Sequence, residues 1–192
     1  GNAVAVTTTT NYTWGSGIVI PGTDIWMNNE MDDFSMRPGT PNVFGLVGSE
    51  ANSIAAGKRP LSSMSPTIVR DLEGNNRIVI GARGGPRITS SVFLSLVNRL
   101  YFGMYLPEAI FAPRFHHQWK PASLFVEQNG FSAETLRELR SYGYDVRSIV
   151  SSAAQHALER SQDGRVWGVV DPRAEGAAVA PVSYTHLTLP TT

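Results

Sequence analysis

A short antiparallel hairpin constrains the fold of this chain more than any other local feature. Residues 65–71 (SPTIVRD) and 76–82 (NRIVIGA) are rich in β-branched residues and flank the turn sequence LEGN. Directly afterwards, residues 86–102 carry apolar side chains every fourth position, which predicts an amphipathic helix. A helix in this place should pack on the sheet that the hairpin begins. The sequence therefore predicts a layered fold with helices on an antiparallel sheet.

Weaker signals of the same kind predict further elements along the chain. Alternating Val and Thr residues predict a strand over 4–10, and a Pro-Gly turn predicts a hairpin over 17–29. The remaining expectations are a short helix at 107–112, a strand at 123–127, a helix from the cap Ser132 to Tyr142, and a hairpin around 162–164. Because hairpins rather than βαβ crossovers connect the strands, the sequence predicts an α+β class and argues against a dinucleotide-binding fold.

The composition excludes several functional classes. Lys plus Arg and Asp plus Glu both number 16, so no net charge attracts nucleic acid or an anionic membrane. The absence of cysteine excludes disulfides, thiolate zinc sites and a cysteine nucleophile. No apolar run reaches the roughly 18–20 residues that span a bilayer. These observations favour a globular domain that binds its ligand through a local site.

The two ends of the sequence predict a domain cut from a longer protein. The chain starts at Gly1, without methionine, inside a strand-like run, so we expect its natural start to lie upstream. Residues 1–180 form the predicted single domain. Residues 181–192 (PVSYTHLTLPTT) contain four threonines and no Asp, Glu, Lys or Arg, and we interpret them as a non-native tail in preference to an ordinary polar C-terminal tail.

A polar cluster follows the second strand of the 17–29 hairpin. It consists of Asn28, Asn29, Glu30, Asp32 and Asp33. Such a cluster can bind an ammonium group through its carboxylates and amide oxygens, or it can be an ordinary solvated turn. A calcium loop is the weakest interpretation, because the glycine and the spaced acids of an EF-hand are missing.

Two adjacent serines stand in a loop between two prolines. Ser62 and Ser63 lie between Pro60 and Pro66, in the stretch KRPLSSMSPTIV at 58–69. Prolines restrict the backbone, so the two hydroxyls can be held in fixed positions. Paired, fixed donors of this kind suit the recognition of a carboxylate.

Two further motifs can each be functional or purely structural. GARGG at 81–85 joins a strand to a helix, where backbone N–H groups can stabilise an anion or form only a tight turn. RFHHQW at 114–119 offers two histidines, but neighbours in an extended segment point in opposite directions and no third ligand stands nearby. Polar packing is therefore the preferred interpretation of RFHHQW, and no metal site is predicted.

Four motifs in a fixed order carry a resemblance to a known family. They are NNEMDDF, KRPLSSMSPTIV, the glycine pair of GARGG, and APRFHHQW. Together they resemble the small subunit of γ-glutamyltranspeptidase, an N-terminal nucleophile hydrolase, over Gly1 to about Arg173. The resemblance implies an αββα four-layer sandwich with antiparallel sheets between helices.

The resemblance also implies roles for eight residues. The α-amino group of a γ-glutamyl substrate would be held by Asn11, Glu30 and Asp33, and its α-carboxylate by Ser62 and Ser63. The remaining roles fall on Gly84 and Gly85, whose N–H groups would form the oxyanion hole, and on Thr9, which would hydrogen-bond to the nucleophile.

The chemistry implied by the resemblance is γ-glutamyl transfer or hydrolysis of glutathione-like amides through a threonine ester, with no cofactor and no metal. The nucleophilic threonine of the family would lie upstream of Gly1, so this fragment alone is expected to be inactive. The expected partner is the large subunit of the same precursor, which contributes an arginine, and no nucleic acid is expected. The expected location is periplasmic or extracellular.

Some features leave other interpretations open. Arg83 and Pro86 stand where family members commonly have small residues, which puts the acceptor or leaving-group preference in doubt. A related acylase of the cephalosporin or poly-γ-glutamate type would share the scaffold. A non-catalytic amino-acid-binding relative is the third possibility.

Overall fold

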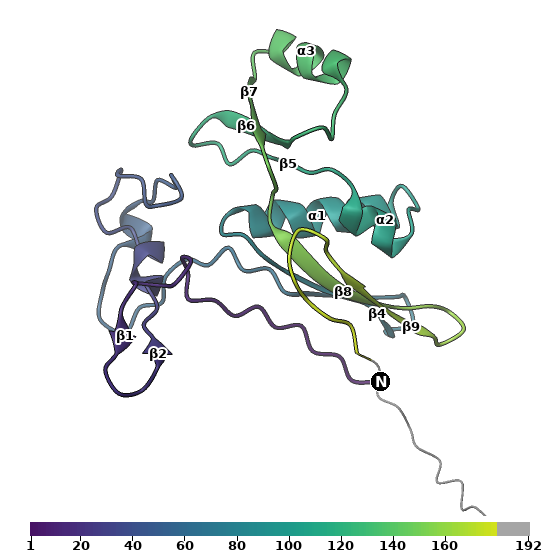
Figure 1. Cartoon of the computed structure of the whole chain (residues 1–192), viewed down its shortest axis with the longest axis horizontal. Coiled ribbons are helices and arrows are strands. Elements are labelled where there is room, and N and C mark those ends of the chain that lie inside the picture. The colour runs from purple at the N-terminus through teal and green to yellow at the C-terminus, as the bar shows by residue number, and fades with distance from the viewer. Residues whose placement is uncertain (180–192) are drawn as a thin grey trace, which may run out of the picture.

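The computed structural model of the chain describes residues 1–179, and the predicted tail at 181–192 lies outside this range. Figure 1 shows a central sheet covered by two helices, a smaller sheet beyond those helices, and a separate lobe built by early residues. We call residues 11–60 the front lobe. None of the helices within residues 1–179 has the length and apolar character needed to cross a bilayer.

The central sheet is antiparallel and contains two of the three predicted hairpins. Its strands are β3 (Thr67–Arg70), β4 (Asn76–Arg83), β8 (Ala154–Arg160) and β9 (Val166–Val170), in the order β3-β4-β8-β9. The predicted hairpins at 65–82 and around 162–164 are thereby confirmed. They meet through the long pairing of β4 with β8, which forms the centre of the sheet.

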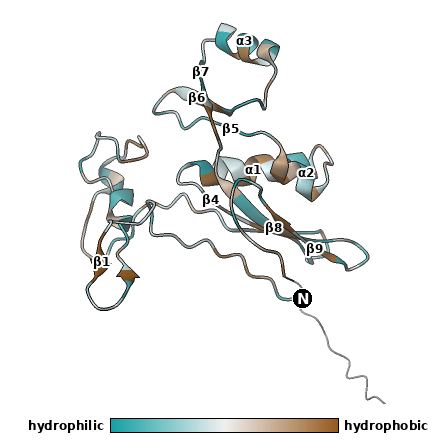
Figure 2. Cartoon of the chain, viewed as in Figure 1, coloured by the Kyte–Doolittle hydropathy of each residue, from teal (hydrophilic) through white to brown (hydrophobic). Residues whose placement is uncertain are grey.

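Helices α1 (Arg87–Leu100) and α2 (Leu106–Phe111) cover one face of this sheet. Alternate residues of β4 point toward them, and the resulting core includes Ile78, Ile80, Ala82, Ile88, Val92, Leu106 and Ile110. Figure 2 shows hydrophobic segments where the helices lie over the sheet. The spacing of four that predicted α1 thus produces the face that is buried.

The opposite face of the central sheet is lined by the first residues of the chain. Thr7 runs close to Gly81 of β4, where an added Cβ would lie 3.1 Å from the Thr7 hydroxyl oxygen. The predicted strand over 4–10 is wrong, because this segment forms no β-ladder with any part of residues 1–179. Its alternating residues suit an extended backbone, but a strand also needs a partner for its N–H and C=O groups.

The smaller sheet departs from the predicted topology. It comprises β5 (Phe115–His116), β6 (Ser123–Glu127) and β7 (Asp145–Ile149), and β6 pairs in parallel with β7 across α3 (Ala133–Ser141). The expectation of hairpins without a βαβ crossover is therefore wrong here. Residues 128–144 are numerous enough for a crossover helix. The predicted cap of α3 is confirmed, since the Ser132 hydroxyl accepts from the Thr135 amide at 3.0 Å.

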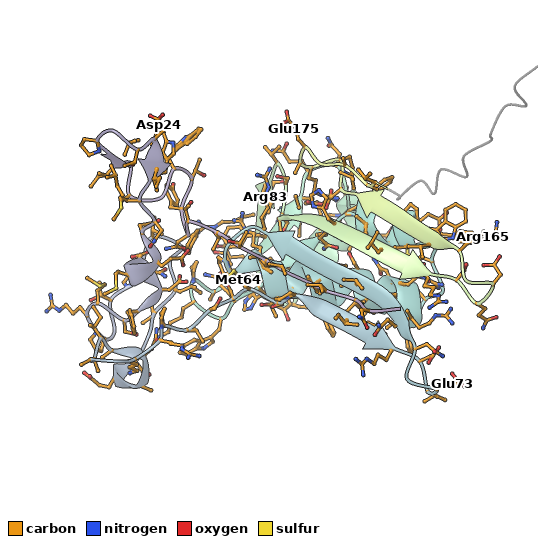
Figure 3. All side chains as sticks on the ribbon, turned by 90° about the horizontal axis from the view of Figure 1, so that it is seen from below. Asp24, Met64, Glu73, Arg83, Arg165 and Glu175 are labelled. Atoms are coloured by element: carbon orange, nitrogen blue, oxygen red, sulfur yellow. The ribbon has the colours of Figure 1, made fainter. Side chains whose placement is uncertain are left out.

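The front lobe contains little regular structure. It holds the small hairpin of β1 (Val19–Ile20) and β2 (Ile25–Trp26), and two 3-10 turns, η1 (Glu30–Asp33) and η2 (Glu50–Asn52). Figure 3 shows this lobe beside the sheet, with Met64 and Arg83 at the junction. The Asn52 amide donates to the Asp33 carbonyl at 2.7 Å, and its oxygen accepts from the Leu61 amide at 2.9 Å. Side-chain amides thus replace the missing strand ladders in this lobe.

A buried ionic network joins the two sheets. The Arg114 side chain, 2% exposed, donates to Asp171 at 2.7 Å, and Arg173 donates to Glu127 at 2.6 Å. Burial would raise the pKa of both carboxyl groups. Burial is the largest single effect, but the hydrogen bonds and positive charges together outweigh it. For Glu127 these are the bond from Arg173 and the amides of Arg114 and Ser152, and for Asp171 they are the Arg173 amide and the side chains of Arg114 and Arg173. Each pKa is therefore held below its usual value.

The same carboxylates also fix the backbone at the start of β8. Glu127 accepts from the Ser152 amide at 2.7 Å, and Asp171 accepts from the Gln155 amide at 3.0 Å. Arg114 in turn donates to the Ser152 and Ala153 carbonyls at 3.4 and 3.3 Å. Residues 152–155 are therefore held from several sides by charged groups.

The network predicts a stability effect at Asp171. Asp171→Asn keeps the shape of the side chain but removes the charge that faces Arg114. We expect the free energy of unfolding to fall by about 3–5 kcal/mol, the usual cost of leaving one partner of a buried ion pair alone. Chemical denaturation of the complete protein measures this change.

Asp163→Asn is the matched control for Asp171→Asn. It makes the same substitution in an ion pair with Arg165, but both side chains of that pair are exposed. The melting temperature should hardly change in this variant. Equal melting temperatures for the two variants would contradict a stabilising role of the buried network.

Candidate active site

A cleft of about 820 Å³ separates the front lobe from the end of the central sheet. Seven of the eight predicted site residues line it: Thr9, Asn11, Asp33, Ser62, Ser63, Gly84 and Gly85. Glu30 is not among the residues from 1–179 that line this cleft, although it shares η1 with Asp33. Segments that are far apart in the sequence thus meet in one place.

The glycine pair ends β4 in a backbone conformation that other residues avoid. Gly84 and Gly85 have φ values of 140° and 58°. A Cβ on Gly84 would lie 2.7 Å from the Ala153 Cα, and one on Gly85 would lie 2.9 Å from the Phe44 ring. Both positions therefore require glycine for conformation and for space.

The amides of this pair are available to a ligand. Neither Gly84 nor Gly85 N–H donates to another group within residues 1–179, whereas both carbonyls accept from the first turn of α1. Two neighbouring free N–H groups at a helix start form an anion-binding position. This geometry agrees with the oxyanion interpretation of GARGG.

The two serines differ in their surroundings. The Ser63 hydroxyl donates to the Gly85 carbonyl at 3.0 Å, so it connects the serine loop to the glycine pair. The Ser62 hydroxyl is exposed and accepts only a local bond from the Met64 amide at 3.2 Å. Ser62 is therefore the freer of the two donors.

Asp33 makes one side of the cleft acidic, and Glu30 belongs to the same turn, η1. Burial raises the pKa of the Glu30 and Asp33 carboxyl groups, and each pKa is raised further by a neighbouring negative charge. That charge comes from Asp33 for Glu30 and from Asp32 for Asp33. A bound cation would relieve this repulsion, so the site suits an ammonium group.

Thr9 and Asn11 bring the start of the chain into the site. The Thr9 hydroxyl accepts from the Asn11 amide at 2.9 Å, and Asn11 has a left-handed φ of 73°. The Asn11 side chain donates to the Asn29 carbonyl at 3.0 Å. Its amide oxygen is thereby left to accept from a ligand beside the acidic cluster.

Sequence reasoning missed several parts of this cleft. Phe44, Ala153 and Arg173 also line it, and none of them was assigned a role. Phe44 lies in a long Gly- and Pro-rich loop. The length of that loop is the only sequence signal that indicates a functional role there. Arg114 donates a hydrogen bond to the Ala153 carbonyl. It is the first residue of RFHHQW, a motif in which the sequence predicts no role for the arginine.

The expected polar packing of RFHHQW is confirmed. His116 is 4% exposed and lies between Ser90 and Gln118, whereas its neighbour His117 is exposed. The two adjacent histidines thus lie in opposite environments, as the extended backbone predicts.

Comparisons with known proteins agree with this geometry. The family model described as Gamma-glutamyltranspeptidase matches residues 1–181. The glutathione hydrolase proenzyme of Escherichia coli K12 is 48% identical over 174 residues, which cover 91% of this chain and 30% of that protein. The chain therefore spans about a third of the length of such curated relatives.

Solved structures match over nearly their full length. A mutant of Helicobacter pylori γ-glutamyltranspeptidase has a TM-score of 0.87 at 43% identity and covers 91% of this chain and 95% of that chain. The γ-glutamyltranspeptidase from Pseudomonas nitroreducens complexed with L-DON has a TM-score of 0.89 at 38% identity, with 95% of each chain covered. These structures have the N-terminal nucleophile hydrolase fold that the sequence predicted. On its cleft, its fold and its sequence, this chain belongs to the γ-glutamyltranspeptidase family.

Proposed function

We propose that the complete protein transfers or hydrolyses γ-glutamyl groups of glutathione and related amides, and that this chain forms most of its substrate site. The observation that carries the proposal is the meeting of acidic, hydroxyl and free amide groups on three sides of one cleft. The family membership and the similarity to glutathione hydrolase proenzymes support the same chemistry.

The two ends of a γ-glutamyl group fit the two polar sides of the cleft. In this proposal Asn11, Glu30 and Asp33 bind the α-ammonium group. Ser62 donates to the α-carboxylate, and Ser63 does so once its hydroxyl turns from the Gly85 carbonyl to the ligand. Acidic acceptors at one side and hydroxyl donors at the other fix the orientation of the substrate, so its γ-carbonyl lies toward the glycine pair.

The remaining residues act on the reacting carbonyl. A threonine hydroxyl adds to the γ-carbonyl while its own α-amine takes the proton. The Gly84 and Gly85 amides donate to the oxyanion that forms. Collapse expels the leaving amine with a proton and leaves a γ-glutamyl ester, which water or an acceptor amine then cleaves. Thr9 would donate to the nucleophile and hold it in place.

Three parts of this proposal concern the whole protein. The nucleophilic threonine would lie upstream of Gly1 and be exposed by autocleavage of a precursor. The large subunit of that precursor would pair with this chain and add an arginine at the substrate carboxylate. A periplasmic or extracellular location remains a prediction by resemblance.

The proposed function is tested by giving the complete gene product two anilide substrates. A γ-glutamyl anilide carries the ammonium group that the acidic side would bind, and a glutaryl anilide lacks it. We expect a clear preference for the γ-glutamyl compound. Preference for the glutaryl compound would favour a related acylase, and no threonine at the processing junction would favour a non-catalytic binding protein.

The serine pair yields a kinetic prediction. Ser62→Ala should lower kcat/KM for a γ-glutamyl anilide by about ten- to a hundredfold, because a hydrogen bond to a charged group contributes about 1.5–3 kcal/mol. Its melting temperature should stay near that of the wild type, since the hydroxyl is exposed. Ser63→Ala should lose similar activity and also some stability, because it loses the bond to Gly85.

Ser132→Ala is the control for the serine variants. It removes the α3 cap outside the cleft, so the melting temperature should fall while the kinetics of the folded enzyme stay normal. If Ser62→Ala behaves like Ser132→Ala, Ser62 does not bind the substrate carboxylate.

The acidic side yields a pH prediction. Binding of the ammonium group requires ionised Glu30 and Asp33, so KM should rise as the pH falls through their raised pKa values. Asp32→Asn removes the negative charge that raises the pKa of Asp33. The rise in KM should therefore move to lower pH in this variant, as initial rates across the acid range will measure. An unmoved profile would show that Asp33 does not control binding.

A further inference from the structure

We propose that His116 and Gln118 form a latch that holds the loop Asn42–Leu46 in place over the glycine pair. The latch gives a positioning role to RFHHQW, the recognised motif that the proposed function leaves without one. Its structural part stands on contacts within this chain, and its kinetic consequence rests on the proposed function.

The loop is a tight turn that can move only as a unit. The Asn42 side-chain oxygen accepts from the amides of Phe44 and Leu46, both at 3.0 Å. The Asn42 carbonyl accepts from the Gly45 amide at 2.9 Å, and its own amide donates to the Leu46 carbonyl at 2.9 Å. These bonds fix the shape of the turn but not its position relative to the central sheet.

The position of the turn matters because Phe44 covers the glycine pair. The Phe44 ring lies so close to Gly85 that an added Cβ would be 2.9 Å from it. Phe44 and Leu46 both line the cleft beside the serine pair. A shift of the loop would therefore widen the cleft beside the N–H groups of the glycine pair.

Gln118 makes the connection to the body of the protein. Its side-chain nitrogen donates to the Phe44 carbonyl at 3.2 Å and to the Lys120 carbonyl at 3.1 Å. Within residues 1–179, the first of these is the only hydrogen bond from the loop to a residue outside the front lobe. The loop's bonds to Asp32, inside the lobe, are long at 3.4 Å.

His116 fixes the orientation of Gln118. Both Gln118 N–H groups are used by carbonyls, so its oxygen faces His116 Nε2 at 2.8 Å and must accept a hydrogen bond from the Nε2–H group. His116 Nδ1 then accepts from the Ser90 hydroxyl at 2.7 Å, a shorter contact than the 3.2 Å between the same hydroxyl and the Arg87 carbonyl. Burial lowers the pKa of His116, which favours this neutral form. A chain of bonds thus runs from the first turn of α1 through His116 and Gln118 to the loop.

The kinetic consequence concerns the fate of the γ-glutamyl ester. A loosened loop admits water beside the glycine pair and constrains an acceptor amine less. We therefore expect the ratio of acceptor transfer to hydrolysis to fall in Gln118→Ala by about three- to tenfold, the range expected for one neutral hydrogen bond. This ratio does not depend on how many enzyme molecules fold, so a purely structural defect would leave it unchanged.

A matched pair of histidine variants separates the two halves of the latch. His116→Gln can keep a donor near the Nε2 position and should retain most of the transfer ratio. His116→Asn can keep an acceptor near the Nδ1 position but loses the donor, so it should resemble Gln118→Ala. His117→Gln alters the exposed neighbour and should resemble the wild type.

A double variant tests whether Gln118 acts through Phe44. Phe44→Ala alone should lower the transfer ratio, and adding Gln118→Ala should lower it no further, because no ring remains to be positioned. Independent, additive effects would overturn the proposed route.

Hydrogen exchange over residues 40–48 of the complete protein provides a readout that needs no activity. We expect faster exchange in Gln118→Ala and His116→Asn, and wild-type exchange in His116→Gln and His117→Gln. Unchanged exchange in Gln118→Ala would overturn the latch whatever the enzyme does. The expected exchange pattern in a protein without γ-glutamyl activity would support the latch and refute the proposed function instead.

Discussion

The buried ion network is the interaction on which the rest of this structure depends. Asp171 and Glu127 face Arg114 and Arg173 in a region where an unpaired charge would be costly. Their remaining lone pairs bind the backbone at the start of β8. Ala153 sits at this point in a left-handed conformation with φ of 68° and contacts Gly84. The shape of the glycine turn is thus tied to charges buried behind it.

The two sides of the candidate site are held in different ways. One side is formed by the ends of the central sheet and α1, and the other by the front lobe. The glycine pair, the serine loop and α1 are joined by hydrogen bonds of 3.0 and 3.1 Å and by the central sheet. The front lobe is held mainly by asparagine side chains and by packing of Phe44. This division lets the groups that would contact the reacting carbonyl stay fixed while the surrounding wall adjusts to a substrate.

Local sequence signals predicted those elements whose partners are close in the chain. The β3–β4 hairpin and the helix α1 follow from β-branched runs and a spacing of four, both of which reflect short-range structure. The segment 4–10 was predicted incorrectly because a strand depends on a distant partner that alternation cannot reveal. The parallel pairing of β6 with β7 was missed for the same reason.

The site was predictable to the extent that its residues belong to recognisable motifs. Ser62 and Gly84 were found in this way, and both line the cleft. Arg173 and Phe44 were not, because their importance comes from contacts across the fold rather than from their neighbours in sequence.

The arrangement of the cleft determines when it can form during synthesis and folding of the chain. All eight predicted site residues lie between Thr9 and Gly85, but the groups that fix the glycine turn lie between Arg114 and Arg173. A chain still emerging from the ribosome would hold every one of those eight residues without yet holding a site. Pairing of β8 with β4 and burial of Asp171 join the two halves of the sequence only after residues 154–171 have been made. Assembly of the cleft and completion of the fold are therefore one event, ordered by contacts of long sequence separation.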